Sequence, residues 1–338
     1  MKKPSSSQIT AVGIDVAKAM LSVCCRSSDG TETALALRNI DTDIRKKLLS
    51  RLHGFTGRIV MESTGHYHWL VALLLSEAGY DVRVVNPILA KQYTSSNIRK
   101  VKTDPADASG LARMAEIADN LPGPFHMTRE ALSLRKKLSL IAGLSHNLQR
   151  LKSTARQLDE AHDSLNDIPS PGEGSLKESI KNLSRTIDTL EDEFLEEAKR
   201  IEDDPEPAMN LDTIPGVTPF LAHVVLHWFE RLPNQTAKSW IGYAGLDVSS
   251  KESGTWRGRC RLTKRGNSDL RRRLYSAAWG ASLSDPNFKA YYVSLRDGGH
   301  SHVESLLILG RKIVRIMFNV LEKNQPYDPS VFSFGGAS

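Results

Sequence analysis

The sequence predicts an α/β domain with a mixed β-sheet, then an antiparallel coiled-coil arm, then a mainly α-helical C-terminal domain. Three observations support this order. Short apolar, β-branched runs alternate with helical periodicity up to about residue 125, as expected for strands and helices around one sheet. Apolar residues then recur at steps of three and four, which is typical of paired helices. Helical patterns dominate the remainder.

The first domain, residues 1–125, is predicted to begin with three hairpin-like strands. Gly30 lies in the turn between the second and the third. Later strands alternate with helices, and strands joined through helices pair in parallel, so a mixed sheet is expected. The expected strands are 9–16, 21–25, 33–37, 59–61 and 82–85, and the expected helices are 43–52, 67–78 and 105–118.

Residues 126–204 are predicted to form two helices joined by a turn rich in proline and glycine at 169–174. Apolar residues follow heptad-like steps from Leu134 to Leu158 and again from Leu176 to Phe194. A narrow apolar stripe with charged flanks is typical of an antiparallel coiled coil that projects or dimerises. Two helices of a compact bundle are the alternative.

The last domain, residues 205–325, is predicted to be mainly α-helical. One helix starts near Pro219, where Thr218 can cap and proline suits the first helical position. Further helical patterns cover 236–243, 268–283 and 302–322, and the tail at 326–338 is expected to be loosely structured.

Composition narrows the class of protein. With 40% hydrophobic and 25% charged residues, the chain resembles an ordinary globular protein rather than a disordered one. Its apolar runs are shorter than the roughly 18 residues of a membrane span, so no membrane partner is expected. The net charge of +6 favours an anionic partner mildly. Cys24, Cys25 and Cys260 lack paired spacing, which argues against a disulfide framework or a zinc site and favours the cytoplasm.

Four carboxylates stand out in the first domain. Asp15 lies within a strand-like apolar run and Glu62 ends another, and a charge among strand residues is costly unless it is paired, hydrogen-bonded or metal-bound. Asp104 and Asp107 share one face at the start of a helix. The alternatives are solvated strand ends for the first two and a capping box for the second two. Together the four could supply hard oxygen ligands for metal-assisted phosphodiester cleavage.

Three motifs that contain these acids resemble the signature of the DEDD transposases, insertion-sequence recombinases related to the Piv DNA invertases. The motifs are GIDVAK at 13–18, MESTG at 61–65 and KTDPADA at 102–108. The resemblance implies a RuvC-like, ribonuclease-H-type fold for the first domain. It also implies that the catalytic, metal-binding residues for Mg²⁺ or Mn²⁺ are Asp15, Glu62, Asp104 and Asp107.

A dense basic block spans residues 257–273, where Asp269 is the only acid. Such a block fits contact with a phosphate backbone, and a merely solvated surface is the alternative. Alternate residues of an extended strand share a face, so the first three arginines would point the same way. The predicted nucleic-acid-binding residues are Arg257, Arg259, Arg261, Lys264, Arg265, Arg271, Arg272 and Arg273.

The residues alone do not choose a nucleophile among Ser249, Ser250 and Ser253. A serine hydroxyl needs activation by a base or a metal, and no partner is evident nearby in the sequence. The DEDD transposases carry a Ser-Gly nucleophile ahead of a Lys-Arg-Gly-Asn stretch, so the resemblance assigns Ser253. The turn at 214–217, IPGV, resembles the hairpin of helix–hairpin–helix DNA binders, although short Pro-Gly turns are common.

The resemblance therefore implies a DNA transposase or site-specific recombinase with a covalent phosphoserine intermediate on Ser253. The expected partners are donor and target DNA, a bridge RNA (which follows from the resemblance alone), and further copies of the chain in a dimer or tetramer. The expected location is the prokaryotic cytoplasm, in association with the nucleoid. Two alternatives stay open: a hydrolytic RuvC-like nuclease of the junction-resolvase type, and an actin-like, sugar-kinase-type phosphotransferase, whose second glycine-rich motif is not evident.

Overall fold

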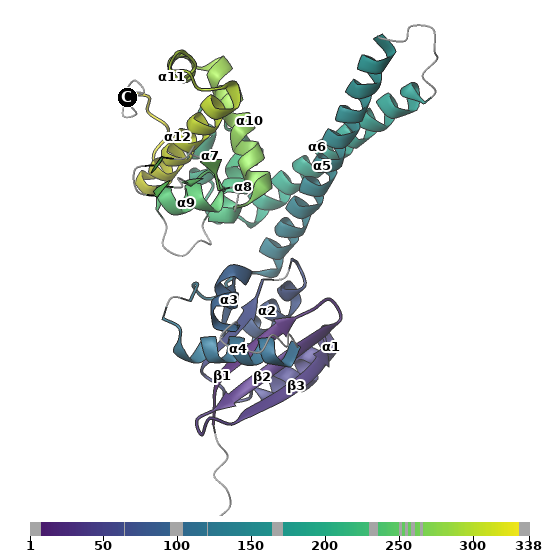
Figure 1. Ribbon diagram of the computed structural model, residues 1–338, viewed down its shortest axis with the longest axis vertical. Helices are drawn as coiled ribbons and strands as arrows, with labels where there is room; N and C mark the ends of the chain where they lie inside the picture. The colour runs from purple at the N-terminus through teal and green to yellow at the C-terminus, as the bar shows by residue number, and fades with distance from the viewer. Residues whose placement is uncertain are drawn as a thin grey trace, which may run out of the picture. The chain divides into compact units, whose positions relative to one another are not determined.

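The computed structural model, shown in Figure 1, divides into two compact units, residues 1–132 and 133–338. The sequence predicted four segments instead, with boundaries after residues 125, 204 and 325. The described residues are 8–63, 65–94, 104–119, 121–163, 172–229, 236–249, 252–253, 256–257, 261–263 and 266–330.

The first unit is built on a five-stranded mixed sheet, as predicted. Its order is β3-β2-β1-β4-β5, with β1 in the centre. The three consecutive strands β1, β2 and β3 pair antiparallel, whereas β4 and β5 continue the sheet in parallel with β1. The strands are β1 (Ile9–Val16), β2 (Met20–Ser27), β3 (Glu32–Arg38), β4 (Arg58–Glu62) and β5 (Asp81–Val85).

Helices cover both faces of this sheet because alternate residues of the central strand β1 are apolar on both sides. Val12, Ile14 and Val16 pack with residues of η1 (Ile44–Leu49) and α2 (His68–Glu77). Ala11 packs on the opposite face with α3 (Pro87–Thr94) and α4 (Asp104–Ile117). The predicted helix at 43–52 is observed as α1 (Asp41–Asp43) followed by the π-helix η1.

The second unit begins within α5 (Arg129–Asp163), which pairs with α6 (Glu173–Ile201) (Figure 1). Lys137 of α5 forms ion pairs with Glu197 and Glu193 of α6 at 3.0 and 3.4 Å. The predicted helical hairpin is therefore observed, whereas its supercoiling as a coiled coil stays a prediction. The predicted boundary after residue 204 does not separate compact units, because Phe194 of α6 is fully buried against Phe220, with ring centroids 5.1 Å apart.

Among the described residues of this unit, six further helices pack around a core in which Phe229 and Trp240 stack with ring centroids 4.0 Å apart. Part of the tail is ordered rather than loose, because the Tyr327 N–H donates to Thr213 Oγ1 at 2.8 Å and its ring lies 6.2 Å from Phe288. These helices are α7 (Glu206–Asp212), α8 (Pro219–Phe229), α9 (Ala237–Tyr243), α10 (Ser268–Ser284), α11 (Pro286–Asp297) and α12 (His302–Lys323). In the described part of the chain, no helix combines the length and the apolar composition that crossing a membrane requires.

Candidate functional site

Two of the predicted acids lie side by side at one edge of the sheet. β1 and β4 are parallel neighbours, and their register pairs Ile14 with Met61. Asp15 and Glu62 are the next residues on each strand, and both are half-buried. Neighbouring strands lie about 4.8 Å apart and side chains alternate between faces, so the two carboxylates project from adjacent positions on the same face.

That face is the one that α4 covers. Gly13 lies two residues before Asp15, and a Cβ added to it would lie 2.2 Å from both the Ala108 carbonyl oxygen and the Ala112 nitrogen. The backbone of α4 therefore rests directly on β1, and only glycine permits the contact. Cys24, which pairs with Gly13 across β1 and β2, packs against the same two alanines.

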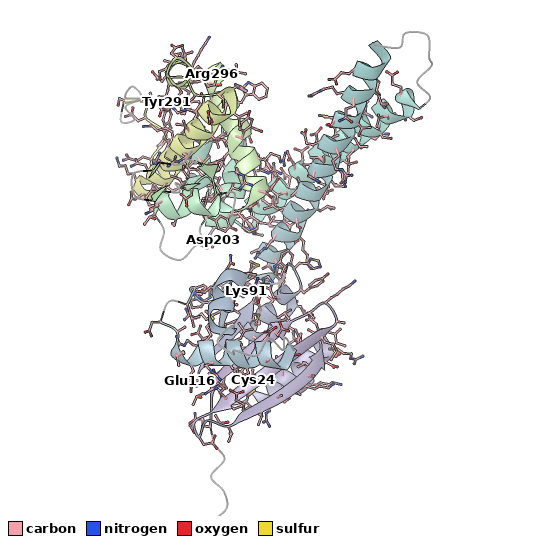
Figure 2. All side chains as sticks on the ribbon, viewed as in Figure 1. Cys24, Lys91, Glu116, Asp203, Tyr291 and Arg296 are labelled. Carbon is pink, nitrogen blue, oxygen red and sulfur yellow. The ribbon has the colours of Figure 1, made fainter. Side chains whose placement is uncertain are left out.

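The direction of α4 places its first turn at the end of the sheet that carries Asp15 and Glu62. Arg58, at the start of β4, donates hydrogen bonds to the Ala118 and Glu116 carbonyl oxygens at 2.8 and 3.0 Å. The C-terminal end of α4 therefore lies at the beginning of β4, and the helix runs back toward the strand end that carries Glu62. Figure 2 labels Glu116 and Cys24, which mark α4 and β2 on this side of the sheet. We call Asp15, Glu62 and the first turn of α4, with Asp107, the acidic edge.

The acidic edge suits a hard cation chemically. In the described part of the chain, neither Glu62 nor Asp107 forms an ion pair or a hydrogen bond, whereas Asp81 and Glu116 of the same unit pair with arginines at 2.6 and 3.0 Å. Carboxylate oxygens without a protein cation are the ligands that Mg²⁺ and Mn²⁺ prefer.

The acidic edge is not a closed metal cage. Among the described side chains, which exclude that of Asp104, no three acidic, histidine or cysteine residues come close enough to hold a metal ion. The backbone of Asp104 begins α4, one residue earlier than predicted. The capping-box alternative depends on the Asp104 side chain and therefore falls outside the described residues. Convergence of all four acids on a metal stays a prediction.

The predicted nucleophile lies in a short β-hairpin of the second unit. Ser253 is in β7 (Glu252–Ser253) and pairs with Trp256 of β8 (Trp256–Arg257). Further from the tip, β6 (Val248–Ser249) pairs with β9 (Arg261–Leu262). Ser253 therefore lies in a strand next to the tip and not in an open loop. Several predicted site residues lie outside the described part of the chain, namely Ser250, Arg259, Lys264 and Arg265. The side chains of Ser249, Ser253, Arg257 and Arg261 lie outside it as well.

The base of this hairpin is held together by its backbone. The Thr263 N–H donates to the Asp247 carbonyl oxygen at 2.8 Å, and the Asn267 N–H donates to that of Tyr243 at 2.7 Å. A Cβ on Gly266 would lie 2.1 Å from the Tyr243 carbonyl oxygen. Asn267 also caps α10, because its side chain accepts two backbone hydrogen bonds there. The glycine and asparagine of the Lys-Arg-Gly-Asn stretch thus have a structural role.

The three consecutive arginines of α10 differ in their surroundings. Arg271 is half-buried and donates to the Ala244 carbonyl oxygen at 3.3 Å. Arg272 is 42% exposed and pairs with Asp269 at 2.7 Å. The Arg273 side chain is 10% exposed, pairs with Asp269 and Glu191 at 2.9 and 3.0 Å, and lies 4.5 Å above the Phe220 ring. Arg273 therefore joins α10 to α6, and its nucleic-acid contact stays a prediction.

Two other predicted features have structural explanations. The IPGV turn packs against α10, because a Cβ on Gly216 would lie 2.1 Å from the Ala277 carbonyl oxygen. Cys24 and Cys25 are free and buried, and burial raises the pKa of the Cys24 thiol to about 12. The Cys24 thiol therefore stays protonated at neutral pH, which suits neither a nucleophile nor a metal ligand.

Comparisons with known proteins cover both regions. Residues 12–162 match the family model of DEDD transposases of the IS110 type, and residues 208–293 match that of the IS116/IS110/IS902 transposase family. The first range contains the acidic edge. The second contains the hairpin of β6, β7, β8 and β9, which we call the serine hairpin because Ser253 lies in it. The pilin gene-inverting proteins of Moraxella lacunata and Moraxella bovis are each 24% identical over 335 residues, which is 95% of this chain and 98% of theirs.

A further relative comes from an insertion element. The uncharacterised 43.6 kDa protein of insertion element IS110 from Streptomyces coelicolor is 27% identical over 179 residues, which is 51% of this chain and 44% of that protein. These matches remove the sugar-kinase alternative. The chain belongs to the IS110 family of DEDD transposases, enzymes that act on DNA.

Proposed function

We propose that this transposase cuts and rejoins DNA with the acidic edge and Ser253 acting together. The observation that carries the proposal is the placement of Asp15 and Glu62 on adjacent parallel strands beneath the first turn of α4. In this proposal Asp15, Glu62, Asp104 and Asp107 hold Mg²⁺ or Mn²⁺. Such an ion, when bound, offsets the charge that develops on the scissile phosphate.

The protein groups have distinct tasks in this reaction. The Ser253 hydroxyl oxygen forms a bond to phosphorus and loses its proton, and the bond from phosphorus to one DNA oxygen breaks, which frees a DNA hydroxyl. The phosphodiester is then stored as a phosphoserine. Attack by a hydroxyl of another strand reverses the step and releases the serine, so strands are exchanged without net hydrolysis.

In this proposal, the basic residues of the hairpin and of the start of α10 bind the DNA backbone. Arg257 and Arg261 lie in the same hairpin as Ser253, and Arg272 of α10 is 42% exposed. With Arg259, Lys264, Arg265 and Arg271, they form the proposed phosphate-binding set. Recombination joins two duplexes, so donor and target DNA require at least a dimer, and a tetramer in the synapse. Within such an assembly, one copy can supply the serine to the acidic edge of another.

A bridge RNA that pairs with donor and target DNA is included in the proposal on the basis of the family resemblance. The names of the Moraxella relatives describe inversion of a pilin gene, which is a rearrangement that the same strand exchange accomplishes. Inversion at a fixed pair of sites needs no RNA guide. DNA cleavage assays with and without RNA transcribed from the flanking element therefore test this part separately.

The test of the serine mechanism is a covalent protein–DNA adduct. End-labelled DNA incubated with the protein and Mg²⁺ should give a band that survives denaturation and disappears after proteolysis. Ser253→Ala should abolish both the adduct and strand exchange, because a methyl group cannot attack phosphorus. Ser249→Ala, in the same hairpin, is the matched control and should retain both.

The competing mechanism is hydrolysis by a RuvC-like nuclease, in which water is the nucleophile. In that case Ser253→Ala would release free DNA ends at the wild-type rate, and the serine mechanism would be wrong. An adduct that persists in Ser253→Ala and disappears in Ser249→Ala would instead identify Ser249 as the nucleophile.

A further inference from the structure

Helix α12 carries three cations on one face that the sequence analysis did not single out. Arg315 is four residues after Arg311 and three after Lys312, so it neighbours both on the helix surface and the three cations share one side of the helix. Arg315 is exposed, and the other two are half-buried. We call these three residues the α12 basic face (α12 is the yellow helix of Figure 1).

The orientation of this face is fixed by the core. Ile313, Val314, Ile316 and Met317 on the other side of α12 are fully buried. Gly310 lies against α10, where an added Cβ would be 3.6 Å from the Leu274 carbonyl oxygen. A helix anchored on one side presents its opposite side at a constant position. The three cations are therefore held together by packing.

The two arginines of this face are not neutralised as others in the unit are. Arg272 and Arg273 both pair with carboxylates, but in the described part of the chain no carboxylate pairs with Arg311 or Arg315. The Arg311 Nε atom is buried and has no hydrogen-bond partner among the described residues. Burial and the neighbouring Arg315 charge lower the pKa of Lys312. Like charges at this spacing repel, so an anion bound here would relieve the repulsion.

The α12 basic face belongs to the same packed body as the serine hairpin. Phe318, on the next turn of α12 after Arg315, meets Trp240 of α9 edge to face, with centroids 5.3 Å apart. α9 ends at Tyr243, and the hairpin base begins with the Tyr243 carbonyl oxygen. Nucleic acid held at the hairpin therefore has a second cationic surface available on the same unit.

We propose that the α12 basic face binds the phosphate backbone of the DNA that the enzyme recombines. The inference rests on the proposed function only in taking DNA as the substrate, and it requires neither Ser253 nor a metal. Two guanidinium groups without carboxylate partners, with an ammonium group between them in the sequence, fit phosphodiester groups, each of which carries one negative charge and which follow one another at even spacing along the strand. Backbone contacts of this kind hold the duplex in register without reading its sequence.

The test is binding of a labelled DNA duplex by the full chain as salt is raised, with a chelator present so that no cleavage intervenes. The variant replaces Arg311, Lys312 and Arg315 with glutamine. Binding should weaken at least about tenfold near 0.1 M salt, and the slope of log K against log salt should fall by up to about 0.9 for each phosphate that the variant no longer neutralises. The matched control replaces Lys289, Arg296 and Lys323, exposed cations of the same unit, with glutamine and should change the slope much less.

Two further variants keep the test decisive. Arg311→Lys with Arg315→Lys preserves charge and should keep the wild-type slope. Arg315→Gln alone, at the exposed position, should lower the slope by about 0.9 even if the triple variant is unstable. Slopes and affinities that match the control would overturn the proposal, as would weakened binding of a structured RNA with unchanged DNA binding. Because the assay measures binding alone, failure to form the Ser253 adduct in the separate cleavage assay would leave this result intact.

Discussion

The acidic edge and the serine hairpin position their proposed catalytic residues in opposite ways. Asp15 lies in an eight-residue central strand that is covered on both faces, and its register with β4 is fixed by the core. Ser253 lies in a strand of two residues whose partner strand also has two. The acidic edge is therefore set by the fold itself, whereas the serine depends on the hairpin base below it.

Glycine serves both regions by allowing close backbone contact. Gly13 lets α4 rest on β1, and Gly266 lets the base of the hairpin approach Tyr243. Both glycines lie inside motifs that resemble catalytic signatures, but neither contributes a functional group. In each region the glycine fixes the backbone, and a nearby residue is the one proposed to carry the chemistry. The presence of such a motif in a sequence therefore indicates a close backbone contact as well as a candidate catalytic residue.

The largest expected effect is on the acidic edge. Asp15→Asn and Glu62→Gln keep the side-chain shape but remove the charge, so DNA cleavage should fall at least about a thousandfold, equivalent to roughly 4 kcal/mol of transition-state stabilisation. DNA binding in a gel-shift assay should persist. Glu116→Gln, at the other end of α4, is the matched control and should cleave normally. Near-normal cleavage by Asp15→Asn and Glu62→Gln would place the metal site elsewhere.

Asp104 and Asp107 are open to a second interpretation, as a helix cap. Because Asp107 has no hydrogen-bond partner among the described residues, its replacement should affect cleavage more than melting temperature. A cap contributes about 1 kcal/mol of stability and nothing to chemistry. If Asp107→Ala lowers only the melting temperature while Mg²⁺-dependent cleavage continues, the capping interpretation holds for that residue.

The next effect separates backbone contact from chemistry. Gly13→Ala would place a methyl group 2.2 Å from two backbone atoms of α4, so α4 must move and the free energy of unfolding should fall by about 3 kcal/mol or more. Gly143→Ala on α5 is the control, because nothing lies within 4 Å of its added Cβ. There alanine should stabilise the helix by about 0.5–1 kcal/mol. Equal melting temperatures for the two variants would contradict the contact between α4 and β1.

Much of the first unit could be predicted because its strands are regular. All five strands appear within a few residues of their predicted positions, since alternation and β-branched runs are local signals. The placement of Asp15 within the first strand and of Glu62 at the end of the fourth could be predicted in the same way. Their adjacency could not, because it depends on the parallel pairing of β1 with β4, strands that are separated by more than 40 residues.

Other features escaped prediction because they depend on distant partners. α11 is an exception, because it has a local start signal at Asp285-Pro286 but was not predicted. The Asp285 side chain accepts two N–H groups at the start of this helix. The ordered Tyr327 depends on Thr213, and the role of Arg273 depends on Glu191, 82 residues earlier in the chain. A run of three arginines in a sequence gives no indication of which one the fold neutralises.

The smallest expected effect concerns that run and compares two adjacent residues. Arg273→Gln removes a largely buried charge that bridges Asp269 and Glu191. Breaking a buried pair typically costs about 3–5 kcal/mol, but Asp269 keeps Arg272, so a decrease of about 2 kcal/mol in the free energy of unfolding is expected. Arg272→Gln, at a more exposed position, should cost no more than about 0.5 kcal/mol. Urea unfolding of both variants measures the difference.

DNA binding should rank the same two variants in the opposite order. Arg272 is accessible to phosphate, so Arg272→Gln should lower the salt slope by up to about 0.9. Arg273 is enclosed between α10, α6 and the Phe220 ring, so Arg273→Gln should leave the slope of the folded protein unchanged. A lowered slope with normal stability in Arg273→Gln would show that its ion pairs open on binding, and would support the nucleic-acid contact predicted from the sequence.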